Sequence, residues 1–338
     1  MEKFDVIIIG GGAAGLSSAI YAARFNLKTL VIVKEKGGLL TLTHLVENWP
    51  GEVAISGMEL MEKIEKHARS YELVNIKEEE VLDVAFLRKE NLREKKAESL
   101  REKETKNGFV VKTAKNSYEG KTLIFATGTL RKKLNVKGEK EFTNRGISYC
   151  ATCDAMLFRN KIVAVAGGGD SAAKEGLLLS EHCKKVYLIY RNELRAEPIN
   201  MDRVKKKIKE GKIELVKGSV IEIKGERFVK SVLLDREFNG KKELNLEGVF
   251  VEIGGIPQTE LAKKLNVKLN EKNEIIINEN SETNVKGVFA AGDVGNKEFK
   301  QAITGASEGV IAAFSAYKYI NRTFLSTERK FSSKERVE

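Results

Sequence analysis

Two of the three cysteines in this 338-residue chain lie close together, as Cys150-Ala-Thr-Cys153, and Asp154 follows directly. Such a pair is typical of a zinc site, a structural disulfide or a redox-active dithiol. Zinc usually needs about four ligands, whereas the chain offers one further cysteine, Cys183, and three histidines. A disulfide closing so small a loop adds little stability and tends to be reduced inside cells. The pattern therefore favours a redox-active dithiol and predicts no metal site.

The residues after Cys150 predict how such a dithiol is activated. The pair opens a predicted helix that continues into 155–161, so the helix dipole would lower the pKa of a cysteine thiol at its start. Thiolate attack on a partner disulfide gives a mixed disulfide, which the second thiolate resolves. Asp154 is placed to supply a proton, and it also suits the first turn of a helix. Cys183 is interpreted as a buried, small apolar residue.

The N-terminal segment has the pattern of a dinucleotide-binding fold. The apolar run 6–9 predicts a buried strand, and the motif Gly10-x-Gly12-x-x-Gly15 then opens a helix rich in small residues. Glycine is needed there because a side chain would keep a pyrophosphate away from the amides of the helix N-terminus. A second strand follows, and Glu35 stands at its end, where a carboxylate can accept a hydrogen bond from a ribose hydroxyl.

The same pattern recurs in the middle of the chain. A predicted strand at 162–166 leads into Gly167-x-Gly169-x-x-Ala172, and a helix follows to about residue 180. The third motif position is alanine, which is still small enough for the helix to pack closely on a strand. The chain therefore has two predicted nucleotide-binding folds, a repeat of fold type rather than a solenoid.

The end of the next predicted strand, 186–189, distinguishes the two folds. Tyr190, Arg191 and Arg195 stand here in place of an acid such as Glu35. A guanidinium suits the 2′-phosphate of a nicotinamide nucleotide, which a carboxylate would repel. Plain surface charge is the alternative interpretation of the two arginines. One acidic and one basic strand end together predict two nucleotides, FAD and a nicotinamide.

A third glycine-containing signal lies near the C-terminus. An apolar strand ends in Ala291-Gly292-Asp293, and a long helix of small residues begins near Gln301. If this segment returns to the first nucleotide, Asp293 can bond a hydroxyl of a flavin's ribityl chain. The helix N-terminus can then face the electron-rich carbonyl edge of the flavin.

These signals predict an α/β protein with two Rossmann-like domains of three ββα layers, the second inserted into the first. We expect an FAD-binding domain at 1–131 and 257–338. We expect a nicotinamide-binding domain, which also carries the cysteine pair, at 132–256.

Composition excludes several other classes. A hydrophobic content of 42% and a charged content of 32% are typical of a soluble globular protein. The apolar runs are too short to cross a membrane, and no secretory signal precedes 4–9, so we expect a cytoplasmic protein. The net charge of +11 is spread among interspersed lysines and glutamates, so we expect no nucleic-acid partner. The charged segment 88–107 predicts an exposed loop or short helix, and the tail 326–338 is expected to be frayed.

The chain resembles the low-molecular-weight thioredoxin reductases over nearly its whole length. The segments that carry this resemblance are Gly10 to Gly15, "GGLLTLTHLVENWPG" from Gly37, "ATG" from Ala126, "CATCD" from Cys150, "GGGDSA" from Gly167, "AAGDV" from Ala290 and "KQA" from Lys300. The resemblance implies a homodimeric flavoprotein that passes electrons from NADPH through FAD to an active-site disulfide. From there they pass to thioredoxin or a thioredoxin-like protein.

The resemblance also implies roles for individual residues. Cys153 becomes the sulfur beside the flavin, Cys150 attacks the partner disulfide, and Asp154 protonates a leaving thiolate or the reduced flavin. The residues expected to hold FAD are Gly10, Gly12, Ala13, Ala14, Gly15, Glu35, Lys36, Gly37, Gly38, Leu39, Leu40, Thr41, Asn48, Val81, Ala126, Thr127, Gly128, Asp293, Val294, Lys300, Gln301 and Ala302. Those expected to hold the nicotinamide are Gly167, Gly169, Asp170, Ser171, Ala172, Tyr190, Arg191, Arg195 and Gly254.

One departure from the family pattern keeps alternatives open. Tyr190-Arg191-Asn192 stands where the family usually has His-Arg-Arg, so NADH, or both nucleotides, could be the donor. A related flavoprotein could serve a glutaredoxin- or peroxiredoxin-type partner, or take electrons from ferredoxin. A redox sensor that keeps FAD for structure alone is disfavoured, because the second nucleotide fold would then have no purpose.

Overall fold

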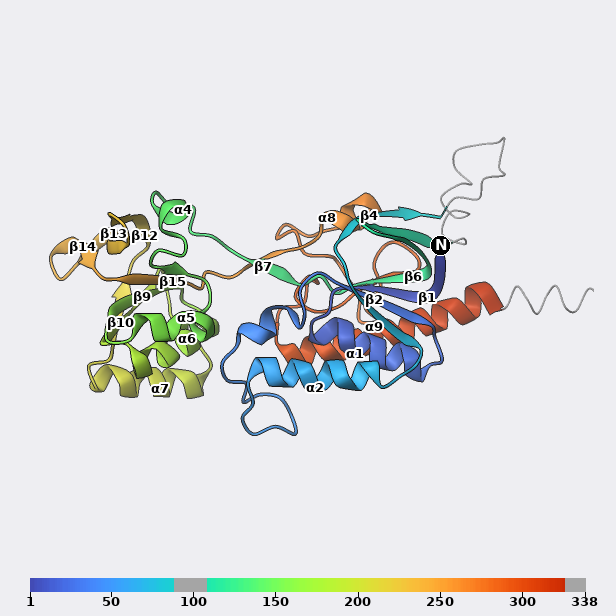
Figure 1. Ribbon diagram of the computed structural model, residues 1–338, viewed down its shortest axis with the longest axis horizontal. Coiled ribbons are helices and arrows are strands. Elements are labelled where there is room, and N and C mark those ends of the chain that lie inside the picture. The colour runs from blue at the N-terminus through green and yellow to red at the C-terminus, as the bar shows by residue number, and fades with distance from the viewer. Residues whose placement is uncertain (88–107, 326–338) are drawn as a thin grey trace, which may run out of the picture. The chain divides into compact units, whose positions relative to one another are not determined.

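The computed structural model describes residues 1–87 and 108–325 (Figure 1). The expectations for 88–107 and for 326–338 lie outside these residues. The chain divides into two compact units, one made of Met1–Thr129 and Pro257–Glu338, the other of Leu130–Ile256. The second unit is therefore an insertion in the first. Which nucleotide each unit binds stays a prediction.

The first unit alternates strands and helices, as the sequence predicts. Its helices and strands are β1 (Glu2–Ile9), α1 (Ala13–Arg24), β2 (Thr29–Val33), the 3₁₀ helix η1 (Gly38–Leu42), α2 (Gly57–Arg69), β3 (Val74–Glu78), β4 (Val81–Phe86), β5 (Phe109–Thr113), β6 (Ser117–Phe125), α8 (Glu260–Lys264), β17 (Val288–Ala290), α9 (Ala302–Ile320) and the π-helical turn η3 (Asn321–Leu325).

A parallel sheet forms the middle layer of this unit. Strands β3, β2, β1 and β6 are neighbours in that order, and β17 pairs with the C-terminal half of β6. The N-terminal half of β6 pairs instead with β5 in an antiparallel meander that β4 completes. Alternate residues of β1 serve opposite faces, because Val6 and Ile8 pack with α1 and α9, whereas Ile7 and Ile9 pack with the meander and α8. The result is three layers (Figure 1).

The two central helices of this unit approach each other very closely. A methyl group on Gly309 of α9 would overlap the backbone carbonyl of Ala14 in α1, and it would lie 2.8 Å from Oγ of Ser18. Ser18 is fully buried and donates its hydroxyl hydrogen to the same Ala14 oxygen. The small residues that the sequence places on both helices therefore allow backbone contact at the N-terminal half of α1.

The second unit repeats this plan. Its helices and strands are α4 (Glu139–Phe142), β8 (Ile147–Ser148), α5 (Ala151–Asp154), the 3₁₀ helix η2 (Ala155–Phe158), β9 (Ile162–Ala166), α6 (Asp170–His182), β10 (Lys185–Tyr190), α7 (Pro198–Lys209), β11 (Ile213–Lys217), β12 (Val220–Gly225), β13 (Val229–Phe238), β14 (Lys241–Asn245) and β15 (Gly248–Val251). Two short strands, β7 (Thr129–Arg131) and β16 (Gly255–Pro257), pair with each other where the chain enters and leaves the insertion.

The parallel sheet of this unit has the order β11-β10-β9-β15-β8. Val163 and Val165 of β9 face the helices α5, α6 and α7. Ala164 and Ala166 face the antiparallel sheet β12-β13-β14. The predicted α/β class with two Rossmann-like folds is confirmed, since both units have parallel sheets with helices on one side and antiparallel strands on the other.

One local expectation needs correction. The helix predicted to begin at the cysteine pair and run into 155–161 is a single turn, α5, followed by the 3₁₀ turn η2. Ala155 and Phe158 of η2 are buried in the core of this unit, whereas Met156 and Leu157 are exposed. So few aligned peptides give only a small dipole, and the direct hydrogen bonds of the turn matter more for a thiolate there.

Substitution of Gly309 by alanine tests the close helix contact. We expect Gly309→Ala to lower the free energy of unfolding by about 1–3 kcal/mol, because the added methyl group overlaps the Ala14 carbonyl. Gly176 of α6 is the matched control, since a methyl group there would meet its nearest neighbour at 3.8 Å. Gly176→Ala should instead raise stability by about 0.5–1 kcal/mol. Chemical denaturation followed by circular dichroism measures both, and changes of the same sign would contradict this packing analysis.

Candidate active site

The first glycine motif contains glycines required for two different reasons. Gly10 has φ +118°, and a side chain on it would clash with the backbone of Ala126. A side chain on Gly15 would clash with the carbonyl of Gly10. Gly12 differs, because its backbone is extended (φ −79°, ψ −173°) and no atom lies within 4 Å of where its side chain would point. The folded chain itself gives Gly12 no reason to be glycine.

The space at Gly12 fits a nucleotide phosphate. Gly12 is the N-cap residue of α1, and no side chain caps that helix. The amides of Ala13, Ala14 and Gly15 belong to the first turn, where the helical ladder has not begun. These donors and the positive end of the helix dipole form an anion site that a side chain on Gly12 would fill. This motif could therefore hold the pyrophosphate of FAD.

The second motif repeats this division. A side chain on Gly167 would clash with the carbonyl oxygen of Glu252, whereas no atom lies within 4 Å of a side chain on Gly169. Gly169 is the extended N-cap residue of α6, again with no side-chain cap. The predicted nicotinamide residues Ser171 and Ala172 follow in its first turn. This motif could hold the pyrophosphate of the nicotinamide nucleotide.

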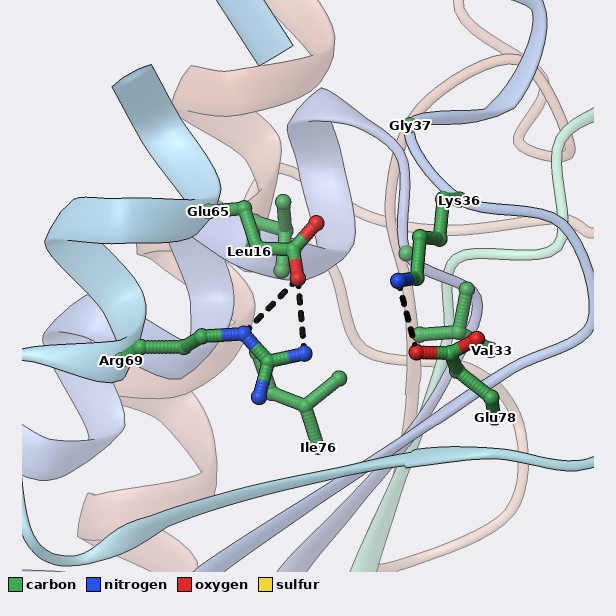
Figure 2. A pocket seen from close by; sticks show the side chains of 9 residues that line it. Leu16, Val33, Lys36, Gly37, Glu65, Arg69, Ile76 and Glu78 are labelled. Carbon is green, nitrogen blue, oxygen red and sulfur yellow. Dashed lines mark hydrogen bonds and ion pairs between the residues drawn. The ribbon is translucent and has the colours of Figure 1, made fainter. Parts of the chain in front are cut away.

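A small hollow, partly open to solvent, lies next to the first motif (Figure 2). It is lined by Gly11, Leu16, Val33, Lys36, Gly37, Glu65, Arg69, Ile76 and Glu78. Two ion pairs border it, Lys36 with Glu78 at 2.7 Å and Arg69 with Glu65 at 2.7 Å. Its place beside the first motif makes these residues candidates for contacts with the adenosine half of FAD. Only Lys36 and Gly37 of this set were predicted. Gly11 lies inside the first glycine motif but was not singled out, and the others come from α1, α2, β2 and β3 and lack a local motif.

The other predicted flavin residues converge through long-range contacts. Asn48 donates a side-chain hydrogen bond to Oε1 of Gln301, the N-cap residue of α9, at 3.1 Å. Lys300 donates to the backbone oxygen of Asp293 at 2.9 Å and pairs with Glu274 at 2.5 Å. Burial raises the pKa of the Asp293 carboxyl above its usual range, with Lys300 opposing this rise. These contacts join segments that are far apart in sequence into one site.

The remaining predicted flavin residues lie in three short segments. Gly37 and Gly38 both have positive φ and turn the chain into η1, where Thr41 donates its hydroxyl hydrogen to the oxygen of Gly38 at 2.8 Å. Leu40 packs on α2, whereas Leu39 and Glu35 are exposed. Further residues occupy the ends of strands or the start of α9: Ala126, Thr127 and Gly128 after β6, Val81 at the start of β4, Val294 after β17, and Ala302 at the start of α9.

The predicted nicotinamide residues lie at the carboxyl ends of β9 and β10. Arg191 and Arg195 are exposed, and the amide of Arg195 bonds the Gly168 oxygen at 2.6 Å. Tyr190 ends β10, and Gly254 follows β15. Asp170 instead joins α6 to the start of α7, since it accepts hydrogen bonds from the Glu197 amide and the Asn200 side chain, both at 2.9 Å.

The charge of Asp170 is held by its own neighbours. Burial alone would raise the pKa of this carboxyl, but hydrogen bonds from Lys174, Asn200 and the Glu197 amide lower it below its usual range. Lys174 lies at 2.8 Å from Oδ2. These contacts connect Asp170 to the loop beside the second glycine motif. Its contact with the nicotinamide stays a prediction.

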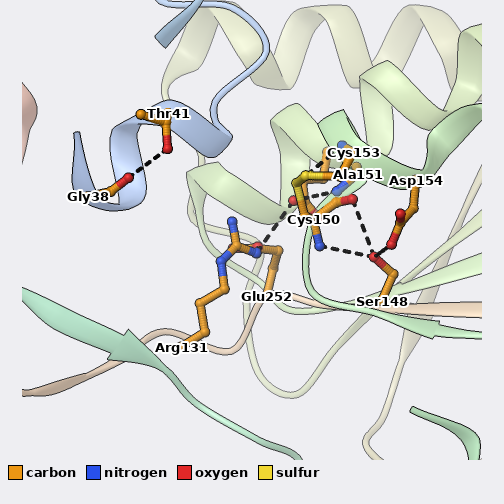
Figure 3. The surroundings of a disulfide bond; sticks show 10 residues. Gly38, Thr41, Arg131, Ser148, Cys150, Ala151, Cys153, Asp154 and Glu252 are labelled. Atoms are coloured by element: carbon orange, nitrogen blue, oxygen red, sulfur yellow. Dashed lines mark hydrogen bonds and ion pairs between the residues drawn. A yellow bond between two sulfur atoms is a disulfide. The ribbon is translucent and has the colours of Figure 1, made fainter. Parts of the chain in front are cut away.

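The two cysteines form a disulfide at the start of α5 (Figure 3). Cys150 is the N-cap residue, and its Sγ accepts a hydrogen bond from the Cys153 amide at 3.1 Å. Cys150 is half-buried and Cys153 is exposed. Once the disulfide is reduced, the same amide can stabilise a Cys150 thiolate directly. This hydrogen bond therefore gives the Cys150 thiolate the stabilisation that the sequence analysis expected from the dipole of a longer helix.

The predicted acid Asp154 is connected to Cys150 through Ser148, which the sequence analysis missed. The Ser148 hydroxyl donates to Oδ2 of Asp154 at 2.7 Å and accepts from the Cys150 amide at 3.0 Å. Ser148 is buried at the end of β8. Its position two residues before the first cysteine was the available signal. The structure thus brings all three predicted catalytic residues into one turn.

A buried ionic cluster lies beside this turn. Glu175 of α6 accepts the Ala151 amide hydrogen at 3.2 Å and lies 3.6 Å from the Arg131 guanidinium. Arg131 also pairs with Glu252, directly after β15 (Figure 3). Burial, then repulsion from Glu175, raises the pKa of Glu252 to about 8, against the effect of Arg131. None of the three ionic residues was predicted, although an acid ending the apolar run of β15 was a visible anomaly.

Cys183 has no part in this turn. It is the C-cap residue of α6 and only 1% exposed, which confirms that it is a buried apolar residue. Burial raises the pKa of its thiol to about 11. Among residues 1–87 and 108–325, no group of acidic, histidine and cysteine side chains could hold a metal ion. No helix in the same part of the chain is both long and apolar enough to cross a membrane.

Two nucleotide folds and a disulfide in a helix-start turn define a nucleotide-dependent disulfide oxidoreductase. A family model described as pyridine nucleotide-disulphide oxidoreductase matches residues 4–309. The thioredoxin reductase of Treponema pallidum (strain Nichols) is 39% identical over 323 residues, which cover 94% of this chain and 97% of the relative.

Solved structures agree with this match. The crystal structure of T. acidophilum thioredoxin reductase is 36% identical, with a TM-score of 0.82, and the match covers 94% of this chain and 99% of that one. The Lactococcus lactis thioredoxin reductase structure is 33% identical, with a TM-score of 0.83 and the same coverage. The chain therefore belongs to the pyridine nucleotide-disulphide oxidoreductase family, within its low-molecular-weight thioredoxin reductases. Membership implies an oxidoreductase that uses FAD and a pyridine nucleotide.

A reciprocal pair of valine substitutions tests the two glycine motifs. Gly12→Val should lower the FAD content of the purified protein at least about tenfold, because the side chain fills the anion site without straining an extended backbone. Gly169→Val should retain FAD and weaken nicotinamide binding by a similar factor. Flavin absorbance and nicotinamide titration measure these effects, with circular dichroism as a check on folding. Equal FAD loss in both variants would contradict the assignment.

Proposed function

We propose that this protein is a thioredoxin-disulfide reductase, with NADPH as its preferred electron donor and Cys150–Cys153 as its redox-active disulfide. The observation that carries the proposal is the disulfide itself, held at the N-cap of α5 in the unit that also carries the second glycine motif. A thioredoxin disulfide has a potential near roughly −270 mV, within reach of a nicotinamide donor. In the net reaction, one NADPH and one proton convert one thioredoxin disulfide to two thiols and leave NADP⁺.

The cofactors are assigned to the two units through their glycine motifs. FAD binds the first unit at Gly10 to Gly15, the Lys36 hollow and the Asp293–Lys300 segment, while NADPH binds the second unit at Gly167 to Ala172. Bound FAD supplies two-electron transfer between the nicotinamide and the disulfide. The chain's own residues orient it through the first-turn amides of α1 and the N-terminus of α9, whose cap residue Gln301 is fixed by Asn48.

The exchange steps follow from the contacts of the disulfide turn. Two electrons break the Cys150–Cys153 bond, and the Cys153 amide stabilises the thiolate on Cys150. Cys150 Sγ attacks one sulfur of the thioredoxin disulfide and displaces the other as a thiolate. Cys153 then attacks Cys150 Sγ, which restores the disulfide and releases the second thiol. Asp154, oriented by Ser148, supplies a proton to a departing sulfur.

We further propose that the enzyme is a cytoplasmic homodimer. Both statements rest on the resemblance to the family and on the reducing environment that a dithiol partner needs. Size-exclusion chromatography with light scattering would measure the assembly. A monomer at working concentration would overturn the dimer proposal without affecting the exchange chemistry.

The first test distinguishes the redox-active Cys150 from the buried Cys183. Cys150→Ser should abolish turnover with thioredoxin, by at least about 10³-fold, because a hydroxyl does not attack a disulfide. Reduction of the bound flavin by NADPH should persist in this variant. Cys183→Ala is the matched control and should keep normal turnover, since this residue is buried away from the disulfide turn. Full thioredoxin turnover in Cys150→Ser would refute the proposed function.

The second test concerns the electron donor. Arg191→Ala should raise KM for NADPH on the order of tenfold, the effect of losing one charge-assisted hydrogen bond, and change KM for NADH little. Arg236→Ala, an exposed arginine on β13, is the control. Stopped-flow flavin reduction by NADPH, NADH and reduced ferredoxin compares the donors. Equal changes in KM for NADPH and NADH would argue against a contact between Arg191 and the 2′-phosphate. Faster flavin reduction by ferredoxin than by NADPH would identify ferredoxin as the donor.

A further inference from the structure

The cluster of Arg131, Glu175 and Glu252 is buried and takes no part in the exchange steps. The side chains of these residues are 22%, 12% and 11% exposed. With one cation and two carboxyls, the cluster has a net charge of −1 when both carboxyls ionise, and none when one is protonated. Burial favours the neutral arrangement, because a net charge away from water is costly.

An unpaired carboxyl oxygen also points to a proton in the cluster. Glu175 and Glu252 both face the single Arg131 guanidinium, and repulsion from Glu175 contributes to the raised pKa of Glu252. Two carboxylates have no hydrogen for a bond between them, whereas a carboxyl and a carboxylate do. Oε2 of Glu175 is buried and has no N–H or hydroxyl donor among the described residues. A protonated Glu252 carboxyl would have a hydrogen to offer this oxygen. The pKa of Glu252, raised to about 8 by burial and by Glu175, fits this assignment.

The shared proton is linked to the disulfide by one hydrogen bond. Oε1 of Glu175 accepts from the amide of Ala151, the residue directly after Cys150. That turn also contains the Cys153 amide, which contacts Cys150 Sγ. A negative charge on the carboxyl pair therefore acts on the turn in which reduction creates a thiolate. Like charges in neighbouring groups disfavour each other, and the half-buried Cys150 is only partly screened by water.

No other ionisable group of the surrounding elements neutralises the pair. Strands β8, β9 and β15 and the turn η2 contain no ionisable residue. The ionisable residues on the other elements packed here, apart from the cluster itself, are Asp154 on α5 and Asp170, Lys174, Glu181 and His182 on α6. Asp170 and Lys174 are paired with each other. Asp154 accepts from Ser148. Arg131 is thus the cation that faces the pair among the described residues.

We propose that Glu175 and Glu252 hold one proton between them, and that this proton controls how readily the Cys150–Cys153 disulfide is reduced. The pair acts by position, through the Ala151 amide, and does not touch the reacting sulfurs. The inference rests on the proposed function in that it describes a regulation of the same redox site.

The proton balance of reduction then changes with pH. Below the titration of the pair, two electrons and one proton convert the disulfide to one thiol and one thiolate, and the pair keeps its proton. Above that titration, the new thiolate increases the affinity of the pair for a proton, so reduction takes up a second proton there. When the carboxyl pair loses its proton as pH rises, the disulfide therefore becomes harder to reduce than it would be beside a cluster that stays neutral.

Glu252→Gln tests this coupling, because glutamine has the shape of the protonated acid and never ionises. The full-length, flavin-bound protein is equilibrated with reduced and oxidised dithiothreitol between pH 6.5 and 9.5. Acid quenching, alkylation and mass spectrometry then measure the reduced fraction of Cys150 and Cys153. The equilibrium constant of wild type relative to Glu252→Gln should be near one at pH 6.5. It should fall on the order of tenfold by pH 9.5, with its midpoint near pH 8. Dithiothreitol titration is common to both proteins and cancels.

Two further variants make the result specific. Glu175→Gln also leaves one carboxyl opposite Arg131, so it should remove the same pH dependence and provides a second measurement should Glu252→Gln fold poorly. Glu237→Gln removes an exposed carboxylate on β13 and should behave as wild type. A constant ratio of wild type to both cluster variants across the pH range would overturn the proposal. An equal fall in the ratio of wild type to Glu237→Gln would also overturn it, because net charge alone would then explain the effect.

The experiment uses neither nicotinamide nor thioredoxin, so it fails independently of the proposed function. If the protein turns over thioredoxin but the ratio is constant, the proposed function stands and the shared proton is refuted. If the ratio depends on pH but thioredoxin is not turned over, the shared proton stands and the protein has another partner.

Discussion

Backbone contact at the carboxyl ends of β1 and β9 is the constraint on which both nucleotide folds depend. Gly10 lies against the Ala126 backbone, and Gly167 lies against the Glu252 carbonyl, so neither position has room for a side chain. These contacts bring adjacent parallel strands and the following helix start together at one edge of each sheet. The second glycine of each motif then faces open space, where a phosphate can approach the helix amides.

The same edge of the second unit explains why redox chemistry and nucleotide binding occur together there. Because Gly167 packs on the backbone of Glu252, the end of β15 lies next to the glycine motif. The Glu252 side chain belongs to the cluster with Glu175, which contacts the disulfide turn. One sheet edge thus carries the disulfide, the buried carboxyls and the predicted nicotinamide site. A buried net charge at this edge is costly, and that cost gives the carboxyls a means of influencing the cysteines.

Much of the fold was predictable because its signals are local. The strands β9 and β10, the end of β2 and the start of α9 were predicted to within about two residues. A strand buried on both faces appears in the sequence as a continuous apolar run. The short helix after the cysteines was predicted too long. Ala155 and Phe158 pack into the core as a helix would allow, but the backbone there is a 3₁₀ turn that leaves Met156 and Leu157 exposed.

Residue types and their spacing were enough to predict two glycine motifs, a cysteine pair with its acid, and an acidic and a basic strand end. Local backbone requirements specify these features, so they can be read along the chain. The pairs of distant residues that share a site, such as Asn48 with Gln301 or Arg131 with Glu175 and Glu252, became known from the folded structure alone. Such contacts arise from the register of parallel strands and the packing of helices on them, and neither leaves a periodic trace in the sequence.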